Sequence, residues 1–226
     1  MITPTVVALD WPQQFRIVSS EFPPINFFER LVESILMEAL TSIESLTNDC
    51  LRDEVGDISL VAAEDRLCGD GFLPVMAAFT HTSHDCPSRF SDGSYGVYYA
   101  ARSLATAIEE SKHHRKLFLS YTAAEPGQID IRVYVGQIEK PLHDIRSAAY
   151  DILHYPNSWL ESQNFAQAIK DSQSWGLVYR SVRDQGGDCI AAFRPPAVSI
   201  PQQGPHLTYI WDSNDIIDVY QKTKVI

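Results

Sequence analysis

The segment RFSDGSYGVYYAARSLATAIEESKHHR, residues 89–115, contains a turn, a strand and a helix in succession and therefore sets the interpretation of the fold. The dipeptide Asp92-Gly93 is typical of a turn. Tyrosine and valine then alternate with other residues over 95–99, which predicts a short strand. Ser103 is a suitable N-cap for a helix that we expect to run from about residue 104 to 115.

This segment also brings together residues that suit a ligand site. On the predicted helix, Thr106 and Glu110 lie on the same face, because residues four apart are neighbours on a helix. Glu110 is therefore expected to point toward the strand end that carries Tyr98 and Tyr99. An arginine such as Arg89, a tyrosine and a glutamate in one place suit an anionic, ring-bearing ligand and a reaction that develops positive charge.

Patterns in the rest of the chain predict further strands and helices. Strands are expected at 11–18, 116–122, 129–138, 177–183, 189–193, 208–211 and 216–220. Helices are expected at 27–43, 147–153 and 158–174, and residues 75–80 form either a short strand or a helical turn. The proline-containing stretch 195–205 reads as irregular. We predict a single α+β domain over residues 1–226, with an acidic N-terminal helical arm at about 21–70.

Charge and hydrophobicity exclude several classes of protein. The net charge is -11, and residues 21–70 carry twelve acidic residues against three arginines. This acidic arm is interpreted as a solvated face, with a docking surface for a basic partner as the alternative. Binding to nucleic acid through the backbone needs a cationic surface, so direct nucleic-acid binding is not expected. We see no membrane span and no signal peptide, and we expect a cytoplasmic protein.

Other common sites lack their sequence signatures. Residues 81–86 contain two histidines and a cysteine, but the spacing matches no common zinc motif, so no metal site is expected. The four cysteines form no CxxC pair and are expected to be free thiols. Ser181 lacks the glycines of a nucleophile elbow, although it could still bind a ligand. Phosphate-binding loops of the P-loop and Rossmann types are absent from the sequence.

Four motifs in order along the chain resemble those of the RES family, which is named after an arginine, a glutamate and a serine. The motifs are FRI at 15–17, RFSDGSYGVYYA at 89–100, TAIEE at 106–110 and YRSVR at 179–183. Through this resemblance, the arginine, tyrosine, glutamate and serine of the family fall on Arg16, Tyr99, Glu110 and Ser181.

The resemblance implies an ADP-ribosyltransferase-like mixed β-sheet core and the role of toxin in a toxin–antitoxin pair. It implies that NAD⁺ is the substrate and is cleaved at the nicotinamide–ribose bond. Inorganic phosphate as co-substrate would give nicotinamide and ADP-ribose 1''-phosphate, whereas water would give ADP-ribose. It implies no cofactor besides these substrates. The implied partner is an Xre-like helix-turn-helix antitoxin, and a homodimer is left open.

The resemblance also assigns roles to residues. Glu110, Arg16 and Tyr99 are the expected catalytic residues, with Glu110 stabilising the oxocarbenium-like centre that forms when the bond breaks. Expected substrate-binding residues are Arg89, Tyr98, Ser181 and Arg183. Two alternatives stay open at this point. The chain could be a protein ADP-ribosyltransferase that uses the same site, or a non-catalytic binding module whose acidic arm docks a basic partner.

Overall fold

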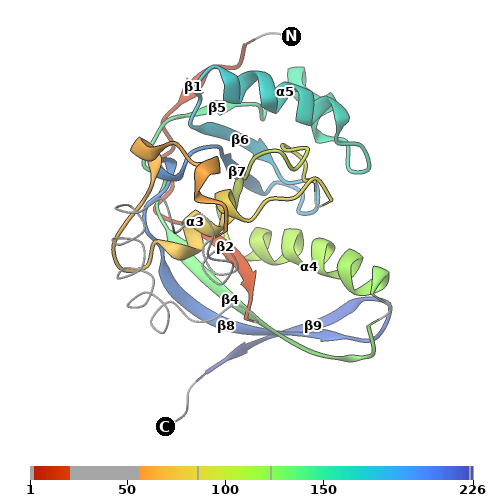
Figure 1. The fold of residues 1–226 in the computed structure, drawn as a ribbon. Coiled ribbons are helices and arrows are strands. Elements are labelled where there is room, and N and C mark those ends of the chain that lie inside the picture. Colours follow the sequence, from red (N-terminus) through yellow and green to blue (C-terminus); the bar gives the residue numbers. More distant parts are fainter. Residues whose placement is uncertain (1–2, 21–55, 86, 123, 224, 226) are drawn as a thin grey trace.

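A computed structural model describes residues 3–20, 56–85, 87–122, 124–223 and 225 (Figure 1). The described strands form one nine-stranded sheet in the order β1-β5-β6-β7-β3-β2-β4-β8-β9. The pairing of β5 with β6 is parallel and the other pairings are antiparallel. The predicted helix at 27–43 lies outside the described residues.

The elements have the following bounds. The strands are β1 (Val6–Val7), β2 (Gln14–Ser19), β3 (Tyr98–Ala101), β4 (Gly127–Gly136), β5 (Leu142–Asp144), β6 (Gly176–Arg180), β7 (Asp188–Ala192), β8 (Gln202–Trp211) and β9 (Ile216–Lys222). The helices are α3 (Leu73–Thr80), α4 (Leu104–Tyr121) and α5 (Leu160–Asp171), with 3-10 turns η2 (Ile58–Leu60), η3 (Ala63–Asp65), η4 (Ala148–His154) and η5 (Pro195–Ala197). The coarse expectation of an α+β fold is confirmed.

The helix after β3 begins as predicted but ends later. The Ser103 hydroxyl accepts a hydrogen bond from the Thr106 N–H at 3.1 Å and so caps α4. The strand predicted at 116–122 is wrong, because α4 continues to Tyr121. Leu104, Ile108 and Leu119 of α4 pack against the same cluster on β4 and β8, which is helical spacing. The alternating apolar residues that predicted a strand were therefore part of an amphipathic helix.

The strands β3 and β8 start at other residues than those predicted. β3 starts at Tyr98 rather than at Tyr95, and residues 89–97 form the loop that leads into it. β8 starts at Gln202, well before the predicted residue 208, and it includes Pro205. The register against β4 shifts next to this proline. A proline without an N–H is tolerated at such an irregularity, and the strand therefore continues through a stretch that looked irregular.

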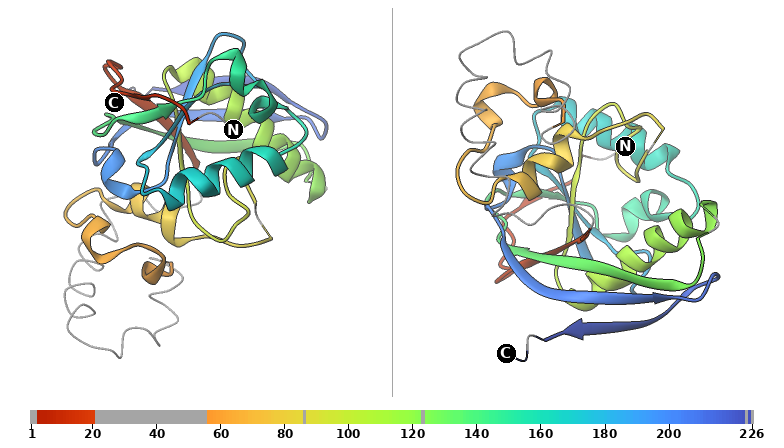
Figure 2. Two further views of the ribbon diagram at one scale, coloured as in Figure 1. Left: turned by 90° about the horizontal axis from the view of Figure 1, so that it is seen from above. Right: turned by 60° about the horizontal axis from the view of Figure 1, so that its bottom comes forward.

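The sheet has helices packed against both of its faces. α3 packs on one side of the central strands, and α5 and η4 pack on the other. The long strands β4 and β8 curve beneath α4, as two views show (Figures 1 and 2). α4 contacts β2 and β3 as well. This arrangement places the middle of α4 close to the neighbouring strands β2, β3 and β7, where a cavity lies.

Part of the predicted acidic arm packs on the body of the domain. Val61 is buried among core residues next to α3. Asp65 accepts two hydrogen bonds from the Arg194 guanidinium, at 2.6 and 2.8 Å. Residues 56–70 are therefore anchored by a buried apolar contact and a bidentate ion pair, while residues 21–55 lie outside the described part of the chain.

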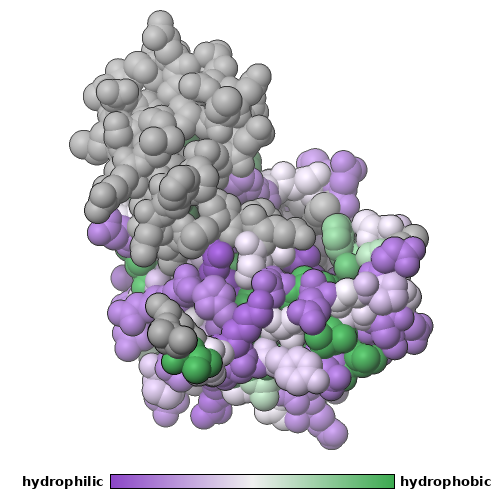
Figure 3. All heavy atoms as spheres, turned by 90° about the horizontal axis from the view of Figure 1, so that it is seen from below, coloured by the Kyte–Doolittle hydropathy of each residue, from purple (hydrophilic) through white to green (hydrophobic). Residues whose placement is uncertain are grey.

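Hydrophilic residues predominate on the face shown in Figure 3, with separate small hydrophobic groups between them. Within the described residues, none of the helices has the length and apolar character needed to span a membrane.

Candidate active site

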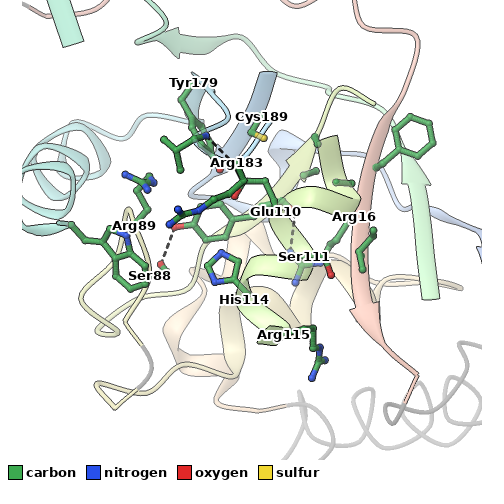
Figure 4. A pocket seen from close by; sticks show the side chains of 18 of the residues that line it. Arg16, Ser88, Arg89, Glu110, Ser111, His114, Arg115, Tyr179, Arg183 and Cys189 are labelled. Carbon is green, nitrogen blue, oxygen red and sulfur yellow. Dashed lines mark hydrogen bonds between the residues drawn. The ribbon is translucent and has the colours of Figure 1, made fainter. Parts of the chain in front are cut away.

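A cavity of about 460 Å³ opens between α4, the strands β2 and β3, the loop before β3 and the turn after β6 (Figure 4). This volume lies in the range of small-molecule binding sites. Among the sequence-predicted site residues, the cavity is lined by Arg16, Arg89, Tyr99, Glu110 and Arg183. The structure thus brings together residues from four segments that are far apart in the sequence.

Glu110 is fixed through one carboxylate oxygen. Its Oε1 accepts a hydrogen bond from the Ser181 hydroxyl at 2.5 Å and a second from the Val182 N–H at 3.3 Å. Its Oε2 accepts no hydrogen bond from any residue that the structure describes. The neighbouring Glu109 instead binds Lys112 at 3.1 Å. Of these two glutamates, Glu110 is therefore the one that lines the cavity. One of its oxygens is fixed by hydrogen bonds, and the other is available to a ligand.

Ser181 positions Glu110 and does not line the cavity. Its hydroxyl donates to Glu110 and accepts from the N–H groups of Arg183 and Asp184, at 3.1 and 2.9 Å. A serine hydroxyl has one donor and two acceptor sites, so these three bonds use its whole capacity. The strand predicted at 177–183 ends at Arg180, and Ser181 begins a turn. Direct contact of Ser181 with a substrate stays a prediction.

Close packing holds this turn against α4. A Cβ on Gly187 would lie 2.6 Å from Thr106 Cγ2 and 2.7 Å from Asp184 Oδ2, so a side chain here would force Thr106 or Asp184 to move. The hydroxyl of Thr106 also donates to Asp184 at 2.7 Å. The first turn of α4 and the Ser181 turn are therefore in contact, which brings Ser181 within reach of Glu110.

Replacing Ser181 with alanine is expected to lower kcat about tenfold, because Glu110 would keep only the Val182 N–H as a partner. KM for the substrate should change less than kcat. Steady-state kinetics would measure both constants. Ser120→Ala removes a hydroxyl that bonds to Lys116 O far along the same helix, and it serves as the matched control. An unchanged kcat in Ser181→Ala would contradict the positioning role.

The two tyrosines of β3 have different surroundings. Tyr99 lines the cavity, and its hydroxyl bonds to Ser88 Oγ at 2.8 Å and accepts from Phe90 N at 3.0 Å. Burial is the main reason why the pKa of Tyr99 rises to about 12, so the hydroxyl is neutral at pH 7. Tyr98 is fully buried in the core beside α3 and donates no surface to the cavity. Adjacent strand residues point to opposite faces, so Tyr98 and Tyr99 differ in their surroundings. Substrate binding by Tyr98 stays a prediction.

Arg16 packs behind β3. Its guanidinium lies over the Tyr98 ring, 4.5 Å from the ring centroid, and its Nη1 donates to Tyr99 O at 3.2 Å. Burial lowers the pKa of Arg16. Its buried Nε has no hydrogen-bond partner among the described residues. Arg16 thus supports both tyrosines from the edge of the cavity, and its contact with a substrate stays a prediction.

Arg89 and Arg183 also line the cavity. The Arg89 side chain is buried and its Nη1 donates to Leu153 O and Tyr155 O, at 3.2 and 2.9 Å. Burial lowers its pKa, and the charge of Glu110 partly opposes this effect. Arg183 donates from Nη2 to Pro156 O at 2.9 Å. Both guanidinium groups are therefore held in place by carbonyl oxygens. Neither of them forms an ion pair with a carboxylate of the described residues.

Comparison with known proteins agrees with the motifs. The RES domain family matches residues 64–212, a range that contains the Glu110 and Ser181 motifs. The chain belongs to the RES family. It is 27% identical over 206 residues to the uncharacterized protein y4oC of Sinorhizobium fredii (strain NBRC 101917 / NGR234), covering 91% of this chain and 86% of that protein.

A solved structure is also similar in part. The crystal structure of the M. tuberculosis MbcT-MbcA toxin-antitoxin complex aligns with a TM-score of 0.37 and 12% identity. The alignment covers 52% of this chain and 67% of that chain.

The charge of the cavity in this RES protein is opposite to that of the whole chain. Arg16, Arg89, Arg115 and Arg183 line it, against the single carboxylate of Glu110. None of these four arginines forms an ion pair with a residue that the structure describes. A cluster of unpaired cations in a partly buried site favours an anionic ligand.

Sequence reasoning missed several residues of this RES cavity. His114 lies one helical turn after Glu110 and lines the cavity, so its position on the Glu110 face of the helix could have indicated it. Burial, Arg183 and Arg89 lower its pKa, in that order. Trp159 and Cys189 also line the cavity, and no sequence pattern pointed to either. Within the described residues, no group of three histidine, cysteine or acidic side chains is arranged to hold a metal ion.

Proposed function

We propose that this RES-family protein cleaves the nicotinamide–ribose bond of NAD⁺ and acts as the toxin of a toxin–antitoxin pair. The observation that carries the proposal is Glu110, anchored through Oε1 and free at Oε2, beside a cavity lined by four arginines. NAD⁺ offers what such a site favours. It has an anionic pyrophosphate for the guanidinium groups and a ribose centre that becomes positive as the bond breaks.

The chemistry follows from the electron flow. When the C1'–nitrogen bond of the nicotinamide ribose breaks, its electron pair moves to the ring nitrogen, and nicotinamide leaves as a neutral base. The ribose carbon develops oxocarbenium character, as in glycoside hydrolysis. Oε2 of Glu110 stabilises that charge and accepts a hydrogen bond from a ribose hydroxyl. Because the leaving group needs no proton, a separate general acid is not required.

Inorganic phosphate is the proposed acceptor, which would give ADP-ribose 1''-phosphate. The unpaired arginines favour an anionic acceptor over water. An Xre-like antitoxin partner, an ADP-ribosyltransferase-like fold and a cytoplasmic location belong to the same proposal and are supported by the four RES motifs in the sequence.

Phosphorus NMR of NAD⁺ incubated with the purified protein and inorganic phosphate tests this function. We expect a new sugar-phosphate resonance to grow as the NAD⁺ resonances fall. ADP-ribose alone would identify a glycohydrolase, and label from NAD⁺ on a protein band would identify a protein ADP-ribosyltransferase. Unchanged NAD⁺ with folded protein would reject the proposed enzyme and favour a binding module.

A further inference from the structure

Residues 153–156, here called the strap, comprise the end of η4 and the two residues after it, and they hold two separate parts of the site. Leu153 O and Tyr155 O accept hydrogen bonds from Arg89, and Pro156 O accepts one from Arg183. Arg89 comes from the loop before β3, and Arg183 comes from the turn after β6. The strap therefore fixes both arginines through its carbonyl groups.

The remaining residue of the strap, His154, uses both ring nitrogens. Its Nδ1 lies 3.0 Å from Tyr150 O, and its Nε2 lies 3.3 Å from Arg180 N. A carbonyl oxygen only accepts hydrogen bonds, so Nδ1 must carry a proton. A backbone N–H only donates, so Nε2 must be unprotonated. The contacts therefore require a neutral imidazole with its proton on Nδ1.

The bond to Arg180 connects His154 with the catalytic carboxylate. Arg180 is the last residue of β6, and the next residue is Ser181, whose hydroxyl holds Glu110. We propose that His154 is a positioning residue, which in its neutral form holds the Ser181 turn behind Glu110 and keeps the strap in place under Arg89. The catalytic part of this inference rests on the proposed function.

The surroundings of His154 maintain its neutral form. Burial lowers its pKa most, and the charges of Arg180 and Arg89 lower it further. The hydrogen bond to Tyr150 O and the charge of Asp151 act in the opposite direction. The ring of Tyr179 on β6 lies beside it, with the ring centroids 6.4 Å apart. With a pKa below its ordinary value of 6.5, His154 is neutral at pH 7.

Protonation of His154 has a defined consequence. An added proton on Nε2 would face the N–H of Arg180, so the hydrogen bond would be replaced by two opposed donors. Activity should therefore be full above the lowered pKa of His154 and fall as the pH drops through it. The free energy of unfolding should change in the same direction, so the contribution of His154 to stability is lost as the pH falls through its lowered pKa. The unfolded chain, with the ordinary histidine pKa, takes up a proton first as pH falls.

Three variants separate positioning from titration. His154→Gln places an uncharged acceptor near the position of Nε2, so it should keep kcat within about twofold of wild type and lose the acidic fall in kcat that is due to His154. His154→Phe keeps a ring but offers no acceptor, and should lower kcat about tenfold with little change in KM. His143→Gln is the matched control, since it removes another histidine of lowered pKa, on β5 and outside the cavity, and should keep that fall.

The ring state of His154 can be tested without enzyme activity. Nitrogen-15 NMR of the histidine side chains should show one neutral imidazole with an unprotonated Nε2 at pH 7, and this signal should disappear in His154→Gln. A protonated ring at pH 7 would overturn the inference, as would kcat in His154→Phe equal to wild type. If wild-type protein does not cleave NAD⁺, the proposed function fails, while the NMR result still decides the state of His154.

Discussion

Replacing Glu110 by glutamine is expected to lower kcat for NAD⁺ cleavage by about 100- to 1,000-fold, the usual cost of losing one electrostatic stabiliser of a transition state. Glutamine keeps an acceptor for the Ser181 hydroxyl and the Val182 N–H, so the local structure should be preserved. What it loses is the negative charge opposite the ribose carbon. The measurement is nicotinamide release by wild type and variant at saturating NAD⁺.

Glu109→Gln is the matched control for this change. Glu109 neighbours Glu110 in sequence but pairs with Lys112, with about half of its side chain exposed. Its kcat should stay within about twofold of wild type, since exposed ion pairs contribute little. If Glu110→Gln turns over NAD⁺ at the wild-type rate, Glu110 is not the stabilising carboxylate and the assignment of the site fails.

Replacing Arg89 by methionine is expected to raise KM for NAD⁺ about ten- to 100-fold, because charge-assisted hydrogen bonds to a phosphate are lost. Removing the buried cation also relieves the cost of its desolvation. The lost bonds to Leu153 O and Tyr155 O oppose that gain. The melting temperature should therefore be measured together with KM, because it shows how far the substitution changes the stability of the fold.

Arg89→Lys and Arg102→Met complete this experiment. Lysine keeps the charge without the planar donor group, so its KM should lie between those of wild type and Arg89→Met. Arg102 is more than half exposed and lies 3.8 Å from Asp188, and its loss should leave KM unchanged. A KM for Arg89→Met equal to wild type, with the fold intact, would show that Arg89 does not contact the substrate.

Local patterns in the sequence predicted the part of the site that depends on local structure. Ser103 capped α4 as expected, and helical spacing placed Glu110 on the face that lines the cavity. Such patterns could not predict which of the two tyrosines, Tyr98 or Tyr99, lines the cavity. Alternation separates the two faces of β3, but both faces of this central strand are covered, so hydrophobicity cannot tell which one carries the cavity.

The roles of Ser181 and His154 depend on contacts between distant segments. Ser181 reaches Glu110 across 71 positions, and His154 reaches Arg180 across 26. No periodicity encodes such contacts. The misassigned strand at 116–122 has a different cause, since a short apolar run fits a strand and the end of an amphipathic helix equally well until its neighbours are known.

The order of strands in the sheet has a consequence during protein synthesis. β3 pairs with β7, and Glu110 is held by the turn between β6 and β7, although β7 ends only at Ala192. A growing chain on the ribosome cannot assemble the site before this hairpin leaves the exit tunnel. Truncated products that end before it cannot form the pairing that holds Glu110. The complete candidate site can therefore form only after the residues up to Ala192 have left the ribosome.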